Sequence, residues 1–236
     1  FENALKEAQN LGYAERNPEA DVEGHDTCRK IAILTAMATG KEVNYEDIYT
    51  EGITRITDID FKYAEKMGTS VKLFGTSRIK DGRVLAYVAP VMINKTSPLY
   101  SVNDVFNGIL VKGNMLGTSM FYGSGAGKLP TASAVVADVV DAAKHLNRNI
   151  MTMWKQEKLK LEDKADAKRR FFVRIKGEKE EMLPKLQDSF GEIEVVEVKE
   201  LEGEFGFVTP VMMEGDYATR ANIYRDEILH MIRVEG

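Results

Sequence analysis

The order of apolar segments near the C-terminal end is the feature of this sequence that most constrains its fold. Beyond residue 168, short runs rich in β-branched and aromatic residues alternate with segments whose apolar residues recur at helical spacing. The predicted elements are strand 171–175, helix 180–190, strand 193–198, strand 205–213, helix 218–229 and strand 231–234. This strand-helix-strand-strand-helix-strand order matches the ferredoxin-like plan.

The preceding residues predict a different arrangement. Helices are predicted over 4–11, 26–39, 58–67 and 131–146, and strands over 71–74, 84–88, 108–112 and 117–122. Asp26 is the predicted N-cap of the second helix, and the Asp81-Gly82 step between two strands is typical of a hairpin. We therefore expect an α+β fold. We expect a first domain with a mixed or antiparallel sheet and helices on one face over 1–150, a linker or connecting helix over 151–168, and a ferredoxin-like domain over 169–236.

Composition excludes several classes of protein. The chain has 236 residues, of which 44% are hydrophobic and 29% charged, with a formal net charge of −5. These values are typical of a globular protein and argue against a general nucleic-acid-binding surface. No apolar run approaches the ~18 residues of a transmembrane helix, so no membrane partner is expected. The single cysteine, Cys28, cannot form an intrachain disulfide and suits a reducing, cytoplasmic environment.

Charged residues cluster where a polar loop meets the second predicted helix. The loop 13–25 contains Pro18, Gly24 and several acids, and Glu15, Asp21, Asp26 and Lys30 follow one another closely. Asp26 and Lys30 are spaced i, i+4, so on a helix they share one face. Carboxylates and an ammonium around one pocket could bind an amino group and donate a proton to a developing alkoxide. The alternative is a polar loop with an exposed ion pair. No metal-ligand spacing accompanies the cluster.

A glycine-rich turn, GSGAG at 123–127, precedes the helix predicted at 131–146. Glycines allow a backbone to approach a phosphate or ring closely, and a helix N-terminus presents N–H groups to an anion. The turn is not the dinucleotide fingerprint G-x-G-x-x-G, because position 128 is Lys. An ordinary tight turn is therefore the alternative to a binding loop.

We expect structural roles for the isolated histidines and for the cysteine. His145 and His230 lie near predicted helix ends, where capping or surface positions are expected. Cys28 is expected to be a buried structural thiol rather than a nucleophile.

Taken as a unit, residues 8–30, AQNLGYAERNPEADVEGHDTCRK, resemble the signature of the homoserine dehydrogenase family. The segments Glu51-Gly52-Ile53, Val71-Lys72-Leu73, 123–127 and Pro130-Thr131-Ala132 also resemble its catalytic region. The C-terminal pattern resembles the ACT regulatory domain found in many members of that family. The resemblance covers essentially the whole chain.

The resemblance implies an activity and a set of site residues. The family reduces aspartate 4-semialdehyde to L-homoserine with NADPH or NADH, on the route to threonine, methionine and isoleucine. By resemblance, Glu15 and Asp26 would bind the amino group of the substrate, and Asp21 would support the same pocket. Lys30 would be the general acid that protonates the carbonyl oxygen. Gly125, with Gly123 and Gly127, would approach the nicotinamide end of the cofactor.

The chain departs from the family at two places. The family's N-terminal dinucleotide-binding domain, a second active-site lysine and a sodium ion site are all expected upstream of Phe1. We therefore expect this chain alone to be inactive with NADP or NAD. In the ACT-like region, residues 176–183 read KGEKEEML where the family has an Asp-x-Pro-Gly-Val-Leu turn. This argues against threonine feedback there, and a structural or oligomerising module is the competing interpretation.

Two classes of function follow from these observations. In the first, the chain is the catalytic and regulatory portion of an enzyme that forms a homodimer or higher homo-oligomer and binds a small amino-acid substrate. In the second, it is a truncated, non-enzymatic homologue that senses an amino acid or modulates an intact partner. A G-x-G-x-x-G motif upstream in the parent reading frame would favour the first.

Overall fold

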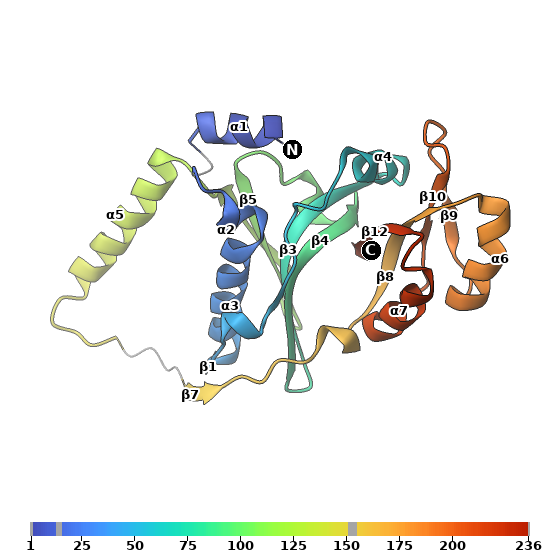
Figure 1. Ribbon diagram of the computed structural model, residues 1–236. Coiled ribbons are helices and arrows are strands. Elements are labelled where there is room, and N and C mark those ends of the chain that lie inside the picture. The colour runs from blue at the N-terminus through green and yellow to red at the C-terminus, as the bar shows by residue number, and fades with distance from the viewer. Residues whose placement is uncertain (1, 13–15, 151–154, 236) are drawn as a thin grey trace. The chain divides into compact units, whose positions relative to one another are not determined.

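The computed structural model describes residues 2–12, 16–150 and 155–235 (Figure 1). The chain groups into two compact units, each assembled from segments that are distant in sequence. The first unit comprises Phe1–Pro18 and Lys95–Trp154, and the second comprises Glu19–Asn94 and Lys155–Gly236. The division of the sequence into domains 1–150 and 169–236, joined by a linker 151–168, stays a prediction.

The second unit is built on one mixed sheet of eight strands. The strands are β2 (Tyr49–Thr50), β3 (Thr69–Lys80), β4 (Arg83–Asn94), β8 (Lys168–Lys176), β9 (Glu194–Val196), β10 (Glu204–Val208), β11 (Met212–Met213) and β12 (Ile228–Glu235). The main order is β2-β4-β12-β8-β10-β9, with β3 paired to β4 and β11 paired to β8. β4 runs parallel to β2 and β12, whereas the other pairs are antiparallel. The expected mixed sheet is confirmed.

Five α-helices complete this unit: α2 (Glu19–Val22), α3 (His25–Thr39), α4 (Asp58–Lys66), α6 (Lys179–Phe190) and α7 (Glu214–Ala221). Short 3-10 turns lie at Tyr45–Asp47, Lys164–Asp166 and Asn222–Tyr224, and β1 (Lys41–Glu42) pairs in parallel with β7 (Lys155–Lys158). Residues 155–168 therefore contain a short strand and a 3-10 turn, and not the connecting α-helix that is one of the two expectations for this segment.

Four of these helices, α3, α4, α6 and α7, bury apolar side chains in three hydrophobic clusters. On α3, Cys28 and Ile31 pack with Val88 of β4. On α4, Tyr63 packs with Phe172 and Ile232. A third cluster joins α6 and α7 to the strands β8 and β10. The expectation of a buried Cys28 is confirmed: the thiol donates a hydrogen bond to the carbonyl oxygen of Tyr45 at 3.3 Å.

The C-terminal region contains the six predicted elements in the predicted order, with two corrected boundaries. The strand predicted over 205–213 is divided, because Pro210 lacks an N–H group and Thr209 uses its hydroxyl to accept a bond from the Phe171 N–H. The helix predicted over 218–229 ends at Ala221, and Ile228 already pairs with Ile175 in β12. β12 also pairs with β4 from Arg233 onward, so the C-terminal strands and the β3–β4 hairpin share one sheet.

The first unit contains α1 (Glu2–Asn10), a 3-10 turn (Pro98–Ser101), a hairpin and a long helix. The hairpin joins β5 (Phe106–Gly113) to β6 (Gly117–Ser124), and α5 spans Lys128–Lys144. The two strands and the helix predicted in this part of the sequence are confirmed, although the helix begins earlier than expected. In this structure no residue of α5 is buried.

Candidate functional site

The start of α3 is determined by a glycine rather than by the predicted Asp26 cap. Gly24 precedes the helix with φ of 78°, a left-handed conformation that favours glycine. It is also closely packed, because a Cβ there would lie 3.2 Å from Val88 and 3.3 Å from Thr50. The prediction of an Asp26 N-cap is wrong: Asp26 lies within the first turn, where a carboxylate interacts favourably with the helix dipole.

Asp26 and Lys30 form the ion pair that their spacing predicted. Lys30 Nζ lies 2.6 Å from Asp26 Oδ2, one helical turn apart on α3. The Lys30 side chain is 60% exposed and the Asp26 side chain 43% exposed, so the pair adds little stability, about 0.3–0.5 kcal/mol. The geometry thus places a proton donor and a carboxylate side by side on an accessible surface.

Of the two remaining predicted carboxylates, Asp21 and Glu15, the structure describes only Asp21. Asp21 lies on α2, exposed to solvent, three residues before Gly24. Glu15 lies outside the described residues. α2 and the start of α3 form a connected segment, since Gly24 N–H donates to Asp21 O and Cys28 N–H donates to Gly24 O. Three of the four residues in the predicted substrate cluster therefore lie on one continuous stretch of backbone.

A turn at Glu51–Ile53 supports this stretch from the other side. Ile53 N–H donates to Val22 O at 2.7 Å, and Glu51 N–H donates to Val88 O at 2.9 Å. A Cβ on Gly52 would collide with the backbone of Val22 and Glu23. The turn is therefore fixed to β4 and presses directly on the C-terminal end of α2.

The Glu51 side chain belongs to a buried ionic network that the sequence did not reveal. Its Oε2 accepts a bond from the Tyr49 hydroxyl at 3.0 Å and from Arg233 Nη1 at 2.6 Å. Arg233 also makes a bidentate contact with the buried carboxylate of Glu214. Burial opposes the charge of Arg233, but the bonds to Glu214 and the charge of Glu51 outweigh it and raise the guanidinium pKa. Glu51 and Arg233 are 182 positions apart, so no local signal could have found the pair.

A second buried network lies between α4 and strands β8, β10 and β12. Asp60 is fully buried, and its Oδ1 lies 3.0 Å from Arg174 Nη1 and from His230 Nδ1. Burial raises the pKa of Asp60, but the close contact with His230 and the hydrogen bonds from Thr57 outweigh this effect and lower the pKa to about 2. The expected surface or helix-end role of His230 is wrong, because this residue lies buried within β12. His145, in contrast, follows α5, and its ring bonds back to Asp141 O, as expected of a helix-end residue.

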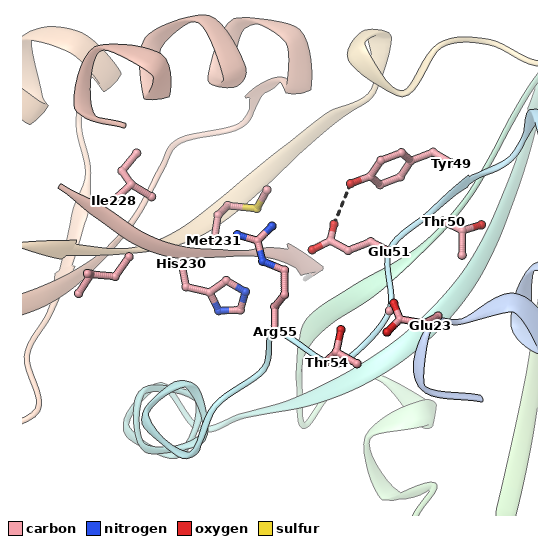
Figure 2. Close-up of a pocket in the computed structure, with 11 residues that line it drawn as sticks. Glu23, Tyr49, Thr50, Glu51, Thr54, Arg55, Ile228, His230 and Met231 are labelled. Carbon is pink, nitrogen blue, oxygen red and sulfur yellow. Dashed lines mark hydrogen bonds between the residues drawn. The ribbon is translucent and has the colours of Figure 1, made fainter. Parts of the chain in front are cut away.

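A cavity of about 370 Å³ lies between the Glu51–Ile53 turn and the first half of β12 (Figure 2). All of its walls belong to the second unit. Figure 2 shows the Tyr49–Glu51 hydrogen bond on one side, with Arg55 and His230 on the other. The lining residues are Glu23, Tyr49, Thr50, Glu51, Gly52, Thr54, Arg55, Ile228, Leu229, His230 and Met231. Asp21, Asp26 and Lys30 are not among them.

The predicted cofactor loop lies in the first unit. Gly123 is the second-to-last residue of β6. The Gly125 N–H donates to Val105 O at 3.0 Å, and Gly127 precedes α5 with a φ of 115°. A side chain at Gly123 would meet open space, and the first turn of α5 carries no acidic residue. Gly125 is not open, because a Cβ there would collide with the side chain of Asn107. Asp21, Asp26 and Lys30 belong to the second unit, whereas Glu15 falls within the sequence range of the first.

The described residues contain neither a metal-binding cluster nor a membrane-spanning helix. Among residues 2–12, 16–150 and 155–235, no group of three or more His, Cys, Asp or Glu side chains could hold a metal ion. Within the same part of the chain, none of the helices has the length and apolar character needed to span a bilayer.

Comparisons with known proteins point to one family. The sequence profile for homoserine dehydrogenase matches residues 1–140. Homoserine dehydrogenase from Neisseria gonorrhoeae is 44% identical over 144 residues, covering 61% of this chain and 33% of the relative. The same enzyme from Helicobacter pylori is 32% identical over 230 residues, covering 98% of this chain and 49% of the relative. The chain therefore spans at most about half the length of these curated relatives.

Solved structures agree over nearly the whole chain. The crystal structure of a homoserine dehydrogenase from Thiobacillus denitrificans has a TM-score of 0.85 at 30% identity, covering 99% of this chain and 58% of that one. A Staphylococcus aureus homoserine dehydrogenase structure has a TM-score of 0.78 at 30% identity, covering 100% and 59%. The fold described above is thus the fold of the corresponding part of these proteins.

Proposed function

Because this chain belongs to the homoserine dehydrogenase family, we propose that it supplies the substrate-binding and proton-donating part of an NAD(P)-dependent oxidoreductase. The proposed reaction interconverts aspartate 4-semialdehyde and L-homoserine, a step in threonine, methionine and isoleucine biosynthesis. The observation that carries the proposal is the Asp26–Lys30 pair on α3, within the segment that resembles the family signature.

Lys30 would act as the general acid. Its ammonium group is held by Asp26 at 2.6 Å and remains open to solvent, so it can reach a bound carbonyl oxygen. When the nicotinamide cofactor is bound, it supplies the hydride for the carbonyl carbon. Lys30 Nζ transfers its proton to the carbonyl oxygen, which becomes the hydroxyl, and Lys30 is left as a neutral amine. A cation beside this oxygen stabilises charge that develops only in the transition state.

The carboxylates would hold the amino group of the substrate. Asp26 lies on the same helical face as Lys30, and Asp21 lies on the segment that leads into this helix. Glu15 completes the proposed set from just before that segment. Binding of the substrate ammonium by these carboxylates would place the reacting carbonyl near Lys30. The binding contacts would then also orient the substrate for the reaction.

The glycine segment would receive the cofactor. We propose that two parts of this chain lie near the nicotinamide end of the cofactor. They are the backbone at Gly123, Gly125 and Gly127 and the N–H groups of the first turn of α5. The discrimination between NAD and NADP would depend on residues outside this chain.

The C-terminal strands and helices would form an ACT-like regulatory or oligomerising module, and the enzyme would assemble as a homodimer or higher homo-oligomer. The support is the order of β8, α6, β9, β10, α7 and β12. Partners other than the small substrate and a second copy are not proposed.

The proposal predicts that Lys30 is essential for the chemical step. In the natural gene product that contains this chain, Lys30→Met should lower kcat for homoserine oxidation by about 100-fold or more, because general acid–base catalysis contributes about 10²–10⁴-fold. The measurement is the initial rate of NAD(P)H formation. Arg29→Met, which removes the neighbouring exposed cation, is the control and should retain nearly full kcat. Equal activity of the Lys30→Met and wild-type proteins would refute the assignment.

A further inference from the structure

We propose that Glu51 and Arg233 are positioning residues that hold the substrate-binding segment 19–26 in place. This inference rests on the proposed function, because it assigns those two residues to the site that contains Asp21 and Asp26. Through this link, strand β12 would be a working part of the substrate site and not only of a C-terminal module.

The first step is the contact between the Glu51–Ile53 turn and α2. Ile53 N–H donates to Val22 O at 2.7 Å, next to Asp21. The approach is so close at Gly52 that no side chain fits against Val22 and Glu23. A movement of this turn must therefore move the backbone that carries Asp21.

The second step is the contact between the same turn and Gly24. The position of a Gly24 Cβ lies 3.6 Å from Glu51 O and 3.3 Å from the Thr50 side chain. Gly24 precedes α3 directly, and its carbonyl oxygen accepts the Cys28 N–H in the first turn. The positions of Asp26 and Lys30 on α3 therefore depend on how firmly the Glu51–Ile53 turn is fixed.

The third step is the ionic anchor of the turn. Main-chain bonding fixes Glu51 to Val88 of β4, and its carboxylate is fixed by Tyr49 and by Arg233 at 2.6 Å. Arg233 is itself immobile, because its side chain is 3% exposed and also bonded to Glu214. A buried, charge-assisted hydrogen bond of this kind resists displacement more strongly than a neutral one.

The geometry assigns a specific kinetic role to this anchor. Glu51 and Arg233 do not lie beside Lys30, so loosening the turn should disturb substrate binding more than proton transfer. The KM for the amino-acid substrate should therefore respond, while the KM for the cofactor should not.

The test uses graded substitutions at Glu51 in the natural gene product. Glu51→Ala removes both side-chain bonds and should raise KM for homoserine about tenfold, with kcat within about twofold, because the turn that supports the substrate-binding segment loses its ionic anchor. Glu51→Gln keeps an oxygen acceptor for Tyr49 and Arg233 and should restore most of the loss.

Glu204→Ala is the matched control. Glu204 also makes a bidentate contact with a buried arginine, Arg174, but it lies on β10, in the other network. A general loss of stability would affect both alanine variants, whereas the KM effect should appear only at Glu51. An unchanged KM in Glu51→Ala, or an equal rise in Glu204→Ala, would overturn the inference.

Amide hydrogen exchange separates this inference from the proposed function, because it needs no activity. In the natural gene product, Glu51→Ala should accelerate exchange of the Ile53 N–H by about tenfold, and Glu204→Ala should leave it unchanged. If Ile53 exchange is unaffected, the positioning role is wrong even when the enzyme is active. If it accelerates but the wild-type protein does not oxidise homoserine, the mechanical link stands and the proposed function fails.

Discussion

Gly52 has no room for a side chain, because the backbone of Val22 and Glu23 lies against its α-carbon. Glycine is the residue that permits such an approach between two backbone segments. The cluster of charged side chains on α2 and α3 therefore depends on a residue that carries no chemistry of its own. This dependence can be measured separately from catalysis.

Gly52→Ala should lower the free energy of unfolding by about 1–3 kcal/mol, since inserting a methyl group into a packed contact forces the backbone apart. Urea denaturation followed by circular dichroism is the measurement. Gly113→Ala is the control, because its Cβ would make only an ordinary contact of 4.0 Å with Gly117 O. Equal stability of the Gly52→Ala and Gly113→Ala proteins would contradict the close approach.

Asp60 predicts a specific loss of stability in acid. Its pKa is lowered from 3.8 to about 2 in the folded protein, so the unfolded state binds the proton more tightly. The stabilisation is complete above pH 4 and is lost as pH falls towards 2, amounting to about 2 kcal/mol. Asp60→Asn should reduce the slope of unfolding free energy against pH in this window.

The matched variant is Asp58→Asn on the same helix, where the side chain is exposed. At neutral pH, Asp58→Asn should be about as stable as the wild-type protein, because the replaced side chain lies in solvent. A pH profile of Asp60→Asn that runs parallel to wild type would show that Asp60 does not titrate in this window. Asp60→Asn should in addition be less stable at neutral pH, because Arg174 loses a buried charged partner.

The sequence could predict contacts between residues close along the chain but not those between distant residues. The Asp26–Lys30 pair follows from helical spacing alone, and the structure contains it. The sequence near His230 predicts a capping or surface position, because its buried partner, Asp60, belongs to a distant element. The sequence near Glu51 resembles a family segment but gives no sign of Arg233, its partner 182 positions away.

At the scale of elements, β12 is the strand on which the second unit depends most. It lies between β4 on one edge and β8 on the other, and it pairs with both. It also contributes His230 and Arg233 to the two buried ionic networks. The strand pattern at 231–234 predicted this element, but its parallel partner β4 could not be predicted, because strand pairing across long distances leaves no periodic signal.

Ile232 and Leu229 give a matched test of the placement of β12. Ile232 is 1% exposed, whereas Leu229 on the same strand is 43% exposed. Ile232→Ala should lower the free energy of unfolding by about 2–5 kcal/mol, because it removes buried apolar volume and leaves a cavity. Leu229→Ala should cost clearly less by the same chemical denaturation measurement. A larger effect at Leu229 would mean that the strand presents the opposite face to the core.

At the scale of the whole molecule, the continuous sheet joins segments that the sequence pattern assigns to separate modules. β3 and β4 belong to the predicted 1–150 module, and β8 to β12 belong to the predicted 169–236 module. The structure places all of them in the second unit, and Phe172, Met92 and Ile232 share one hydrophobic cluster. Elements separated in sequence are therefore energetically connected.

This connection predicts that the two modules of the second unit unfold together. Amide exchange under native conditions should give similar opening free energies for the buried centres of β4 and β10. Ile232→Ala should lower both values together. Separate responses, with β10 unaffected and β4 weakened, would indicate that the modules are independent in stability.

The position of β12 between β4 and β8 also determines the order in which the protein can fold during synthesis. β4 ends at Asn94, yet β12, which pairs with residues 91–93 of β4, begins only at Ile228. While the ribosome makes the intervening residues, β2 can pair with Tyr87 and Val88, but residues 91–93 on the same edge of β4 have no partner strand. Pairings over such distances form slowly, and the exposed apolar surface promotes aggregation. We therefore expect the nascent chain to need chaperone protection until β12 emerges.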